Sequence, residues 1–259
     1  MCYCDFVTGI TFRIVKPHTP LLPLGFDWRT QRWLKFPVLF EIFNTQLPVD
    51  EDNMKQRLRE FCFMPKMSTF SIAAMINRAV HQMSPDHVFI NVGVWHGFTL
   101  LAGMADNLDK ACIGVDNFSS YGSPREDFRE KFDYHRSAKH QFYEMDYVDY
   151  FSNVHKQPIG VYIYDGDHSY ANQLRGLQIA EPYFSDNCII LIDDANYDAT
   201  RRGTRDFIAG SSNQYEVIFD ETTYGNSHPT FWNGFLILQR VSQKSNGGGV
   251  GENGRQNGR

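Results

Sequence analysis

The sequence predicts an α/β fold, a doubly wound and mostly parallel seven-stranded sheet with an antiparallel final edge strand and an N-terminal cap segment. Short apolar runs alternate with helical patterns from residue 69 onward, as in βαβ units. The run C-I-I-L-I-D at 188–193 is continuously apolar, which is typical of a strand covered on both faces. The last two strand-like runs have no helix-length insert between them, so they are expected to pair antiparallel.

The helices are predicted from apolar residues at helical spacing. In residues 69–82, for example, Ile72, Met75, Ile76 and Val80 form one stripe, which indicates a helix with one buried face. Further helices are expected at 99–107, 124–138, 147–155, 169–184 and 200–209. The strands are expected at 87–92, 111–116, 141–144, 161–165, 188–193, 215–219 and 234–238.

The chain divides into three segments by composition. Residues 1–68 are aromatic and contain prolines, with one helix expected after Asp50 because acidic residues favour a helix start. We interpret this segment as a cap or arm that supports a homo-oligomer. Residues 69–241 form the α/β domain, and the Gly- and Asn-rich stretch 242–259 is expected to be a disordered tail.

Bulk composition excludes several classes of protein. No stretch is long and apolar enough for a membrane helix, and the first residues do not read as a signal peptide. A net charge of −5 and a pI near 6.0 argue against a nucleic-acid binder. The odd count of five cysteines suits reduced thiols. We therefore expect a cytoplasmic protein with a small-molecule partner, and with no nucleic-acid or membrane partner.

Acidic residues stand where the predicted parallel strands end. Ligands of such sheets bind at the carboxyl ends of the strands. The residues at these ends are Asp116, Asp146, Asp165, Asp193 and Asp194.

The first strand instead ends in a turn that contains Gly93 and Gly97. Its G-x-x-x-G spacing differs from the G-x-G-x-x-G that binds a diphosphate, whereas Asp116 is placed to accept hydrogen bonds from a ribose. The combination suggests a nucleoside ligand without phosphates, as in S-adenosylmethionine.

The aspartates of the fourth and fifth strands predict a cation site. Asp165 and the pair Asp193–Asp194 end strands that should be neighbours. Two like charges about 4 Å apart repel by roughly 4 kcal/mol at an effective dielectric of 20, and a hard cation such as Mg²⁺ would relieve this repulsion. Alternatively, the Asp pair caps the next turn and Asp165 faces solvent; the D-G-D-H motif at the preceding strand end favours the cation.

Two residues beside Asp165 are candidates for a general base. His168 titrates near neutrality, which suits removal of a hydroxyl proton. Asp167 is equally close in sequence but is a weaker base unless its pKa is raised. The alternative for His168 is a residue that hydrogen-bonds the backbone at a helix start.

Four motifs together resemble a known family. G-V-W-H-G-F, V-D-N-F, Y-D-G-D-H-S-Y and I-L-I-D-D occur in that order, as in the class I S-adenosylmethionine-dependent methyltransferases. The closest likeness is to the metal-dependent, macrocin-type sugar O-methyltransferases of macrolide and aminocoumarin biosynthesis, and it covers residues 69–240. The resemblance implies that the domain 69–241 binds S-adenosylmethionine and Mg²⁺.

The resemblance also assigns roles to single residues. Asp165, Asp193 and Asp194 match the metal ligands. Asp167 matches the base of one branch of the family and His168 that of another, and we favour His168. The predicted cofactor-binding residues are Asn91, Gly93, Gly97, Asp116 and Asp146. Asn91 replaces the usual acidic residue, so it can hydrogen-bond the ammonium group of the methyl donor but adds no charge.

These observations predict an O-methyltransferase that acts on a hydroxyl of a small molecule, either a sugar or another vicinal diol. Two alternatives stay open. One is a nucleotide- or NAD-binding enzyme on a similar sheet, which the missing third glycine disfavours. The other is a methyltransferase-like binding module without activity, which the acids at the strand ends disfavour.

Overall fold

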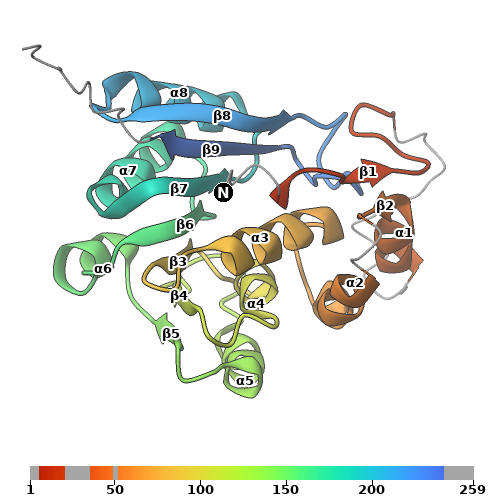
Figure 1. Ribbon diagram of the computed structural model, residues 1–259, viewed down its shortest axis with the longest axis horizontal. Coiled ribbons are helices and arrows are strands. Elements are labelled where there is room, and N and C mark those ends of the chain that lie inside the picture. The colour runs from red at the N-terminus through yellow and green to blue at the C-terminus, as the bar shows by residue number, and fades with distance from the viewer. Residues whose placement is uncertain (1–5, 21–35, 49–51, 242–259) are drawn as a thin grey trace, which may run out of the picture.

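The computed structural model describes residues 6–20, 36–48 and 52–241. They form a seven-stranded sheet with helices on both faces and a smaller two-stranded sheet in the N-terminal segment (Figure 1). The predicted tail at 242–259 lies outside the described residues. In the ranges that the structure describes, no helix is both long and apolar enough to cross a membrane.

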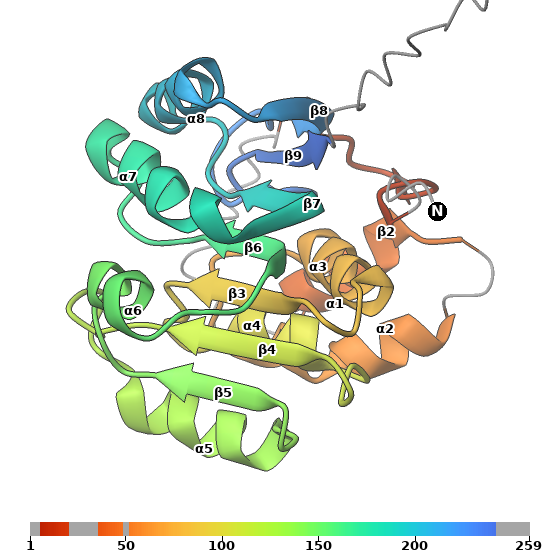
Figure 2. The same cartoon turned by 60° about the vertical axis from the view of Figure 1, so that its left-hand side comes forward.

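The sheet has the predicted mixture of parallel and antiparallel strands. Its order is β5-β4-β3-β6-β7-β9-β8 (Figure 2). The strands are β3 (Val88–Val92), β4 (Ala111–Val115), β5 (His140–Tyr143), β6 (Ile159–Tyr164), β7 (Phe184–Ile192), β8 (Gln214–Glu221) and β9 (Phe235–Val241). The first five pair in parallel, whereas β9 is antiparallel to both β7 and β8. The order reverses direction between β3 and β6, which is where α/β sheets bind ligands.

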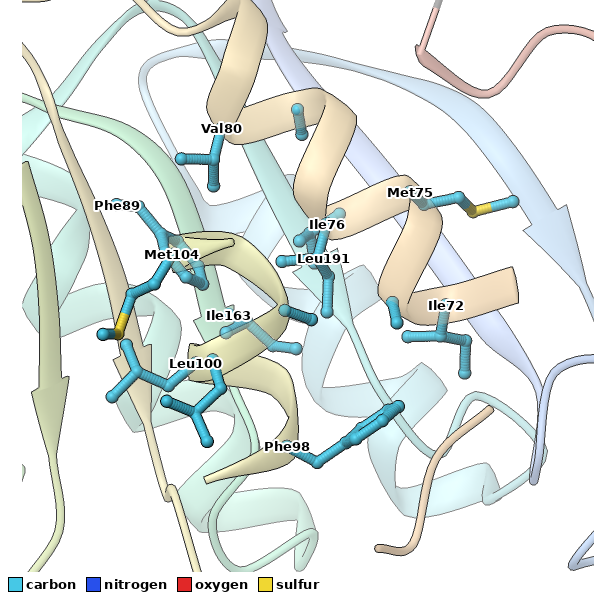
Figure 3. Close-up of a cluster of buried hydrophobic side chains, with 14 of the residues drawn as sticks. Ile72, Met75, Ile76, Val80, Phe89, Phe98, Leu100, Met104, Ile163 and Leu191 are labelled. Atoms are coloured by element: carbon cyan, nitrogen blue, oxygen red, sulfur yellow. The ribbon is translucent and has the colours of Figure 1, made fainter. Parts of the chain in front are cut away.

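Alternation along the strands places one hydrophobic core on each face. Phe89, Val161 and Ile163 belong to the cluster that contains α3 (Phe70–Gln82) and α4 (Phe98–Met104), part of which is drawn in Figure 3. Ile90 and Tyr162 belong to the opposite cluster. The other long helices are α5 (Arg125–His135), α6 (Tyr147–Asn153), α7 (Tyr170–Ala180) and α8 (Asp198–Gly210). Both faces of the central strands are therefore buried, which explains their continuously apolar sequences.

The helix predicted at 169–184 is shorter in the structure. It ends at Ala180, and a 3₁₀ turn, η4 (Glu181–Tyr183), leads directly into β7. Pro182 lies at the start of this turn, where it cannot donate a backbone hydrogen bond to continue the α-helix. The strand therefore begins four residues earlier than its most apolar part suggests.

The N-terminal segment packs against the same core as α3. Its elements are β1 (Thr11–Phe12), α1 (Phe36–Asn44), β2 (Thr45–Gln46), α2 (Asp52–Arg59) and the 3₁₀ turn η3 (Phe61–Phe63). The helix expected after Asp50 is α2. A buried ion pair anchors α1, because Lys66 Nζ lies 2.7 Å from Glu41 Oε2. Glu41 also accepts a hydrogen bond from the backbone N–H of Phe70 at 3.2 Å, so the cap is tied to the first residue of α3.

Candidate active site

The glycine turn lies between the ends of three neighbouring strands. Gly93 and Gly97 have φ of +79° and +96°, a region that favours glycine. A Cβ on Gly93 would approach the carbonyl oxygen of Asp165 to 2.0 Å, so no other residue fits there. The N–H of Gly93 donates to Val115 and that of Asp165 donates to Val92. The turn thus lies at the point where the sheet order reverses.

Asp116 shapes the glycine turn. Its Oδ2 accepts hydrogen bonds from the backbone N–H groups of Val94 at 2.8 Å and Trp95 at 2.9 Å. Its Oδ1 accepts from the N–H of Phe118 at 2.7 Å. Most of the acceptor capacity of this carboxylate therefore serves the protein itself. The expected contact with a ribose stays a prediction.

The other two predicted cofactor residues also hold backbone. Asn91 is fully buried, its Oδ1 accepts from the Thr99 hydroxyl at 2.6 Å, and its amide nitrogen donates to the carbonyl of Gly93 at 2.9 Å. Asp146 caps α6 by accepting from the N–H of Val148 at 2.8 Å. Asn91 lies in β3 next to the turn, whereas Asp146 follows β5, two strands away in the sheet. Their contacts with a ligand stay predictions.

Four side chains gather at the ends of β6 and β7, and we call them the acidic cup: Asp165, His168, Asp193 and Asp194. One ligand atom from each of Asp165, His168 and Asp193 lies within 4.8 Å of the others. His168 Nε2 is 3.6 Å from Asp165 Oδ1 and 3.7 Å from Asp194 Oδ2. The sequence prediction that these aspartates converge agrees with this arrangement, and His168 is part of the same group.

The charges of the cup are only partly compensated by the described residues. Asp193 is buried and its Oδ1 has no hydrogen-bond partner among the described residues. Burial, reinforced by the charges of Asp165 and Asp194, raises its pKa well above the usual value. Burial also raises the pKa of Asp194, although His168 opposes this shift. The carboxylates in turn raise the pKa of His168 against the effect of its own burial.

The donor set of the cup fits a hard divalent cation. Three carboxylates supply oxygen ligands, which Mg²⁺ prefers, and the orphaned oxygen of Asp193 points to a missing partner. Asn233, which sequence reasoning did not find, donates its amide to Asp194 Oδ1 at 3.0 Å. The sequence around Asn233 does not indicate this contact, because Asn233 lies in the loop before β9 and comes close to the cup only when the chain folds.

Asp167 is turned toward the start of α7. Its Oδ1 accepts from the N–H of Ser169 and its Oδ2 from the amide of Asn172, both at 2.8 Å. These bonds, that to the Ser169 backbone above all, lower the pKa of Asp167. A carboxylate whose proton affinity is lowered is a weaker base, so the geometry favours His168 of the two candidates.

The comparisons with known proteins concern this same region. Residues 90–195 match the family model of a methyltransferase domain. The match runs from β3 through the glycine turn to the Asp193–Asp194 pair, and thus contains both halves of the site. None of the curated proteins compared with the sequence matches it.

Solved structures share the fold at low sequence identity. Cofactor-bound Rv0187 from MTB is similar with a TM-score of 0.54 and 12% identity, over 74% of this chain and 91% of that one. The O-methyltransferase from Bacillus cereus in complex with SAH has a TM-score of 0.51 and 10% identity. The match covers 75% of this chain and 93% of that one. TomG, the O-methyltransferase of tomaymycin synthesis from Streptomyces achromogenes in complex with SAM, has a TM-score of 0.50 and 14% identity. The match covers 82% of this chain and 98% of TomG. The chain therefore has a methyltransferase α/β fold.

Proposed function

We propose that this protein is an S-adenosylmethionine-dependent O-methyltransferase that requires a divalent cation, Mg²⁺ by preference. Its acceptor is a small molecule with neighbouring hydroxyls, a sugar or another vicinal diol. The observation that carries the proposal is the acidic cup, which lies directly beside the glycine turn through the contact of Gly93 with Asp165.

The methyl donor is expected above the glycine turn. The backbone of Asp165 and the ring of Phe128 occupy the places that a Cβ on Gly93 and on Gly97 would take, so this tight turn needs glycine at both positions. The family match to a methyltransferase domain and the fold shared with proteins solved with SAM or SAH support this placement. Asp116 and Asn91 keep the turn in shape, and Asp146 stands at the next strand end but one.

A cation in the cup would be held by Asp165, Asp193 and Asp194. When bound, Mg²⁺ would supply a Lewis acid beside the acceptor hydroxyls. The buried, like-charged and incompletely hydrogen-bonded carboxylates support this role. Asn233 holds one oxygen of Asp194 in place.

His168 is the proposed general base. At Nε2 it takes the proton of the acceptor hydroxyl, and the oxygen then attacks the methyl carbon of the donor. The new O–C bond forms as the S–C bond breaks, so the positive sulfonium becomes a neutral thioether. The side chain of His168 is mostly buried between the two strand ends, which keeps its ring in one place.

Donor binding and methyl transfer test this proposal separately. Calorimetry should detect binding of S-adenosylmethionine, and label should move from its methyl group to one member of a panel of sugars and catechols. EDTA should stop the transfer and Mg²⁺ should restore it. Binding of NAD with no binding of S-adenosylmethionine would favour a nucleotide-dependent enzyme instead.

The His168→Ala variant tests the base. We expect it to retain donor binding and to lose on the order of a hundred- to ten-thousand-fold in turnover. Asp167→Asn is the matched control, because both oxygens of Asp167 are engaged at the start of α7. Full turnover in His168→Ala would contradict the proposed role.

A further inference from the structure

Gln173 is a buried polar residue that the proposed mechanism does not use. It lies in the second turn of α7 and is fully buried. Its amide nitrogen faces the hydroxyl of Thr204 in α8 at 3.4 Å, whereas its Oε1 has no partner among the described residues. A buried acceptor without a donor destabilises the folded state, so the burial of this oxygen needs an explanation.

A complementary orphan lies next to Gln173. The Nδ1 atom of His168 is also buried and also has no partner among the described residues. Nε2 of the same ring faces Asp165 and Asp194, so Nδ1 lies on the side of the ring away from these carboxylates. One unpaired donor and one unpaired acceptor are thus buried in the same part of the fold.

The start of α7 brings the two side chains together. Ser169 is the N-cap residue, and its hydroxyl accepts from the N–H of Asn172. His168 is therefore the residue before the cap, and Gln173 is the fourth residue of the helix. Side chains at these two positions pack against each other in the hydrophobic staple. Here the pair is polar, and the amide of Gln173 contributes to the raised pKa of His168.

Packing leaves Gln173 little freedom to turn away. Gly203 of α8 lies against it, and a Cβ on that glycine would be only 3.1 Å from both Cβ and Cγ of Gln173. Thr204, the next residue of α8, contacts the amide nitrogen. The amide is thus confined between α7 and α8, with its nitrogen against Thr204 and its oxygen unpartnered.

We propose that Gln173 is a positioning residue, which accepts a hydrogen bond from Nδ1–H of His168 and so directs the free Nε2 lone pair into the acidic cup. The hydrogen bond at one imidazole nitrogen fixes which nitrogen carries the proton. A third group that orients the base in this way is a common part of hydrolase triads. The inference deepens the proposed function, since it concerns the residue proposed as the base.

Nitrogen NMR of the imidazole tests the hydrogen bond without any turnover. In the wild type saturated with Mg²⁺, a neutral His168 ring should carry its proton on Nδ1 and none on Nε2, because the cation offsets the carboxylates that face Nε2. Gln173→Met removes the acceptor at similar volume and should raise the population with the proton on Nε2. Gln173→Glu retains an acceptor oxygen and should preserve the wild-type state. The signal is assigned by its loss in His168→Ala.

Gln178→Met is the matched control, because Gln178 is exposed on the same helix. It should leave the His168 signals unchanged.

Once an acceptor that is methylated has been found, Gln173→Met should lower turnover on the order of 10- to 100-fold, the range seen when such supporting hydrogen bonds are removed. Donor binding should be unchanged. Circular dichroism checks that each variant is folded.

Two results would overturn the inference. One is a neutral His168 that carries its proton on Nε2 in the wild type saturated with Mg²⁺, and the other is a Gln173→Met spectrum identical to that of the wild type. Failure of the proposed function has a different signature. In that case S-adenosylmethionine does not bind, yet the proton on Nδ1 still depends on Gln173.

Discussion

Asp116 and Asp193 occupy equivalent places in the fold but have opposite surroundings. Each follows a parallel strand directly at its carboxyl end. Asp116 accepts three backbone hydrogen bonds from the loops around it. Asp193 is buried between two other carboxylates and has an oxygen with no partner among the described residues. The protein compensates the first charge itself, whereas the described residues leave one oxygen of the second without a partner.

An acid at a strand end is therefore not by itself a ligand site. The carboxylate must also retain acceptor capacity that the protein does not use. Asp146, which caps α6, resembles Asp116 in this respect. Asp165 and Asp193 resemble each other, since they share the cup with His168. Three experiments test how these buried groups contribute to stability.

Asp116→Ala should have the largest effect, on stability. It removes the acceptor of three backbone N–H groups, and we expect the free energy of unfolding to fall by about 4 kcal/mol. Urea denaturation measures this change. Asp116→Asn retains one oxygen and should lose less. A wild-type unfolding curve for Asp116→Ala would mean that the turn does not need this carboxylate.

Acid should destabilise the protein through a group remote from the cup. Burial lowers the pKa of His155 from 6.5 to about 4, and its Nδ1 pairs with the Tyr150 hydroxyl at 3.0 Å. Between these values the unfolded chain binds the proton more readily, so stability falls as the pH drops from 6.5 to about 4. The full loss would be about 3 kcal/mol.

Asp193 contributes to the pH dependence with the opposite sign. Its raised pKa means that the folded chain binds this proton more readily, so its contribution favours folding as the pH falls. Urea denaturation in EDTA over a range of pH measures the free energy of unfolding. In acid, this free energy should fall less for His155→Gln than for the wild type. An equal fall in the two proteins would contradict the assignment to His155.

Asp193→Asn should have the smallest effect and the most specific one. Without divalent cations it removes a buried, repelled charge, and we expect it to stabilise the protein by roughly 1–2 kcal/mol. The wild type should gain about 2.7 kcal/mol when Mg²⁺ or Mn²⁺ is present at a hundred times its Kd. The variant should lose most of this gain. Thermal unfolding with and without the cation measures both effects, and an equal gain in the two proteins would exclude a cation at Asp193.

The sequence was sufficient to predict the sheet and the convergence of Asp165, Asp193 and Asp194 at one edge. Alternating apolar runs indicated the strands, and the pairing of β6 with β7 followed from their chain order. It did not predict that Asp116 turns back onto the loop. That contact depends on positive φ at Trp95 and Phe118, and neither residue is of a type that signals such a backbone.

The sequence also did not predict Asn233 and Gln173, because their contacts form only in the folded chain. Asn233 donates a hydrogen bond to Asp194, 39 positions away in the chain. The residues around them in the sequence do not indicate this contact. Gln173 has the composition of an ordinary helix residue. Only its full burial and its orphaned oxygen separate it from the exposed Gln178.

Residue types along the chain predicted which elements form and where charge can gather, because side-chain periodicity and the succession of strands are visible in the sequence. Tertiary structure alone decided which of those charges the protein satisfies. Hydrogen bonds to Asp116 and their lack at Asp193 depend on the direction of single N–H and amide groups. Those directions are set by packing between segments far apart in the chain, and no pattern of residue types encodes them.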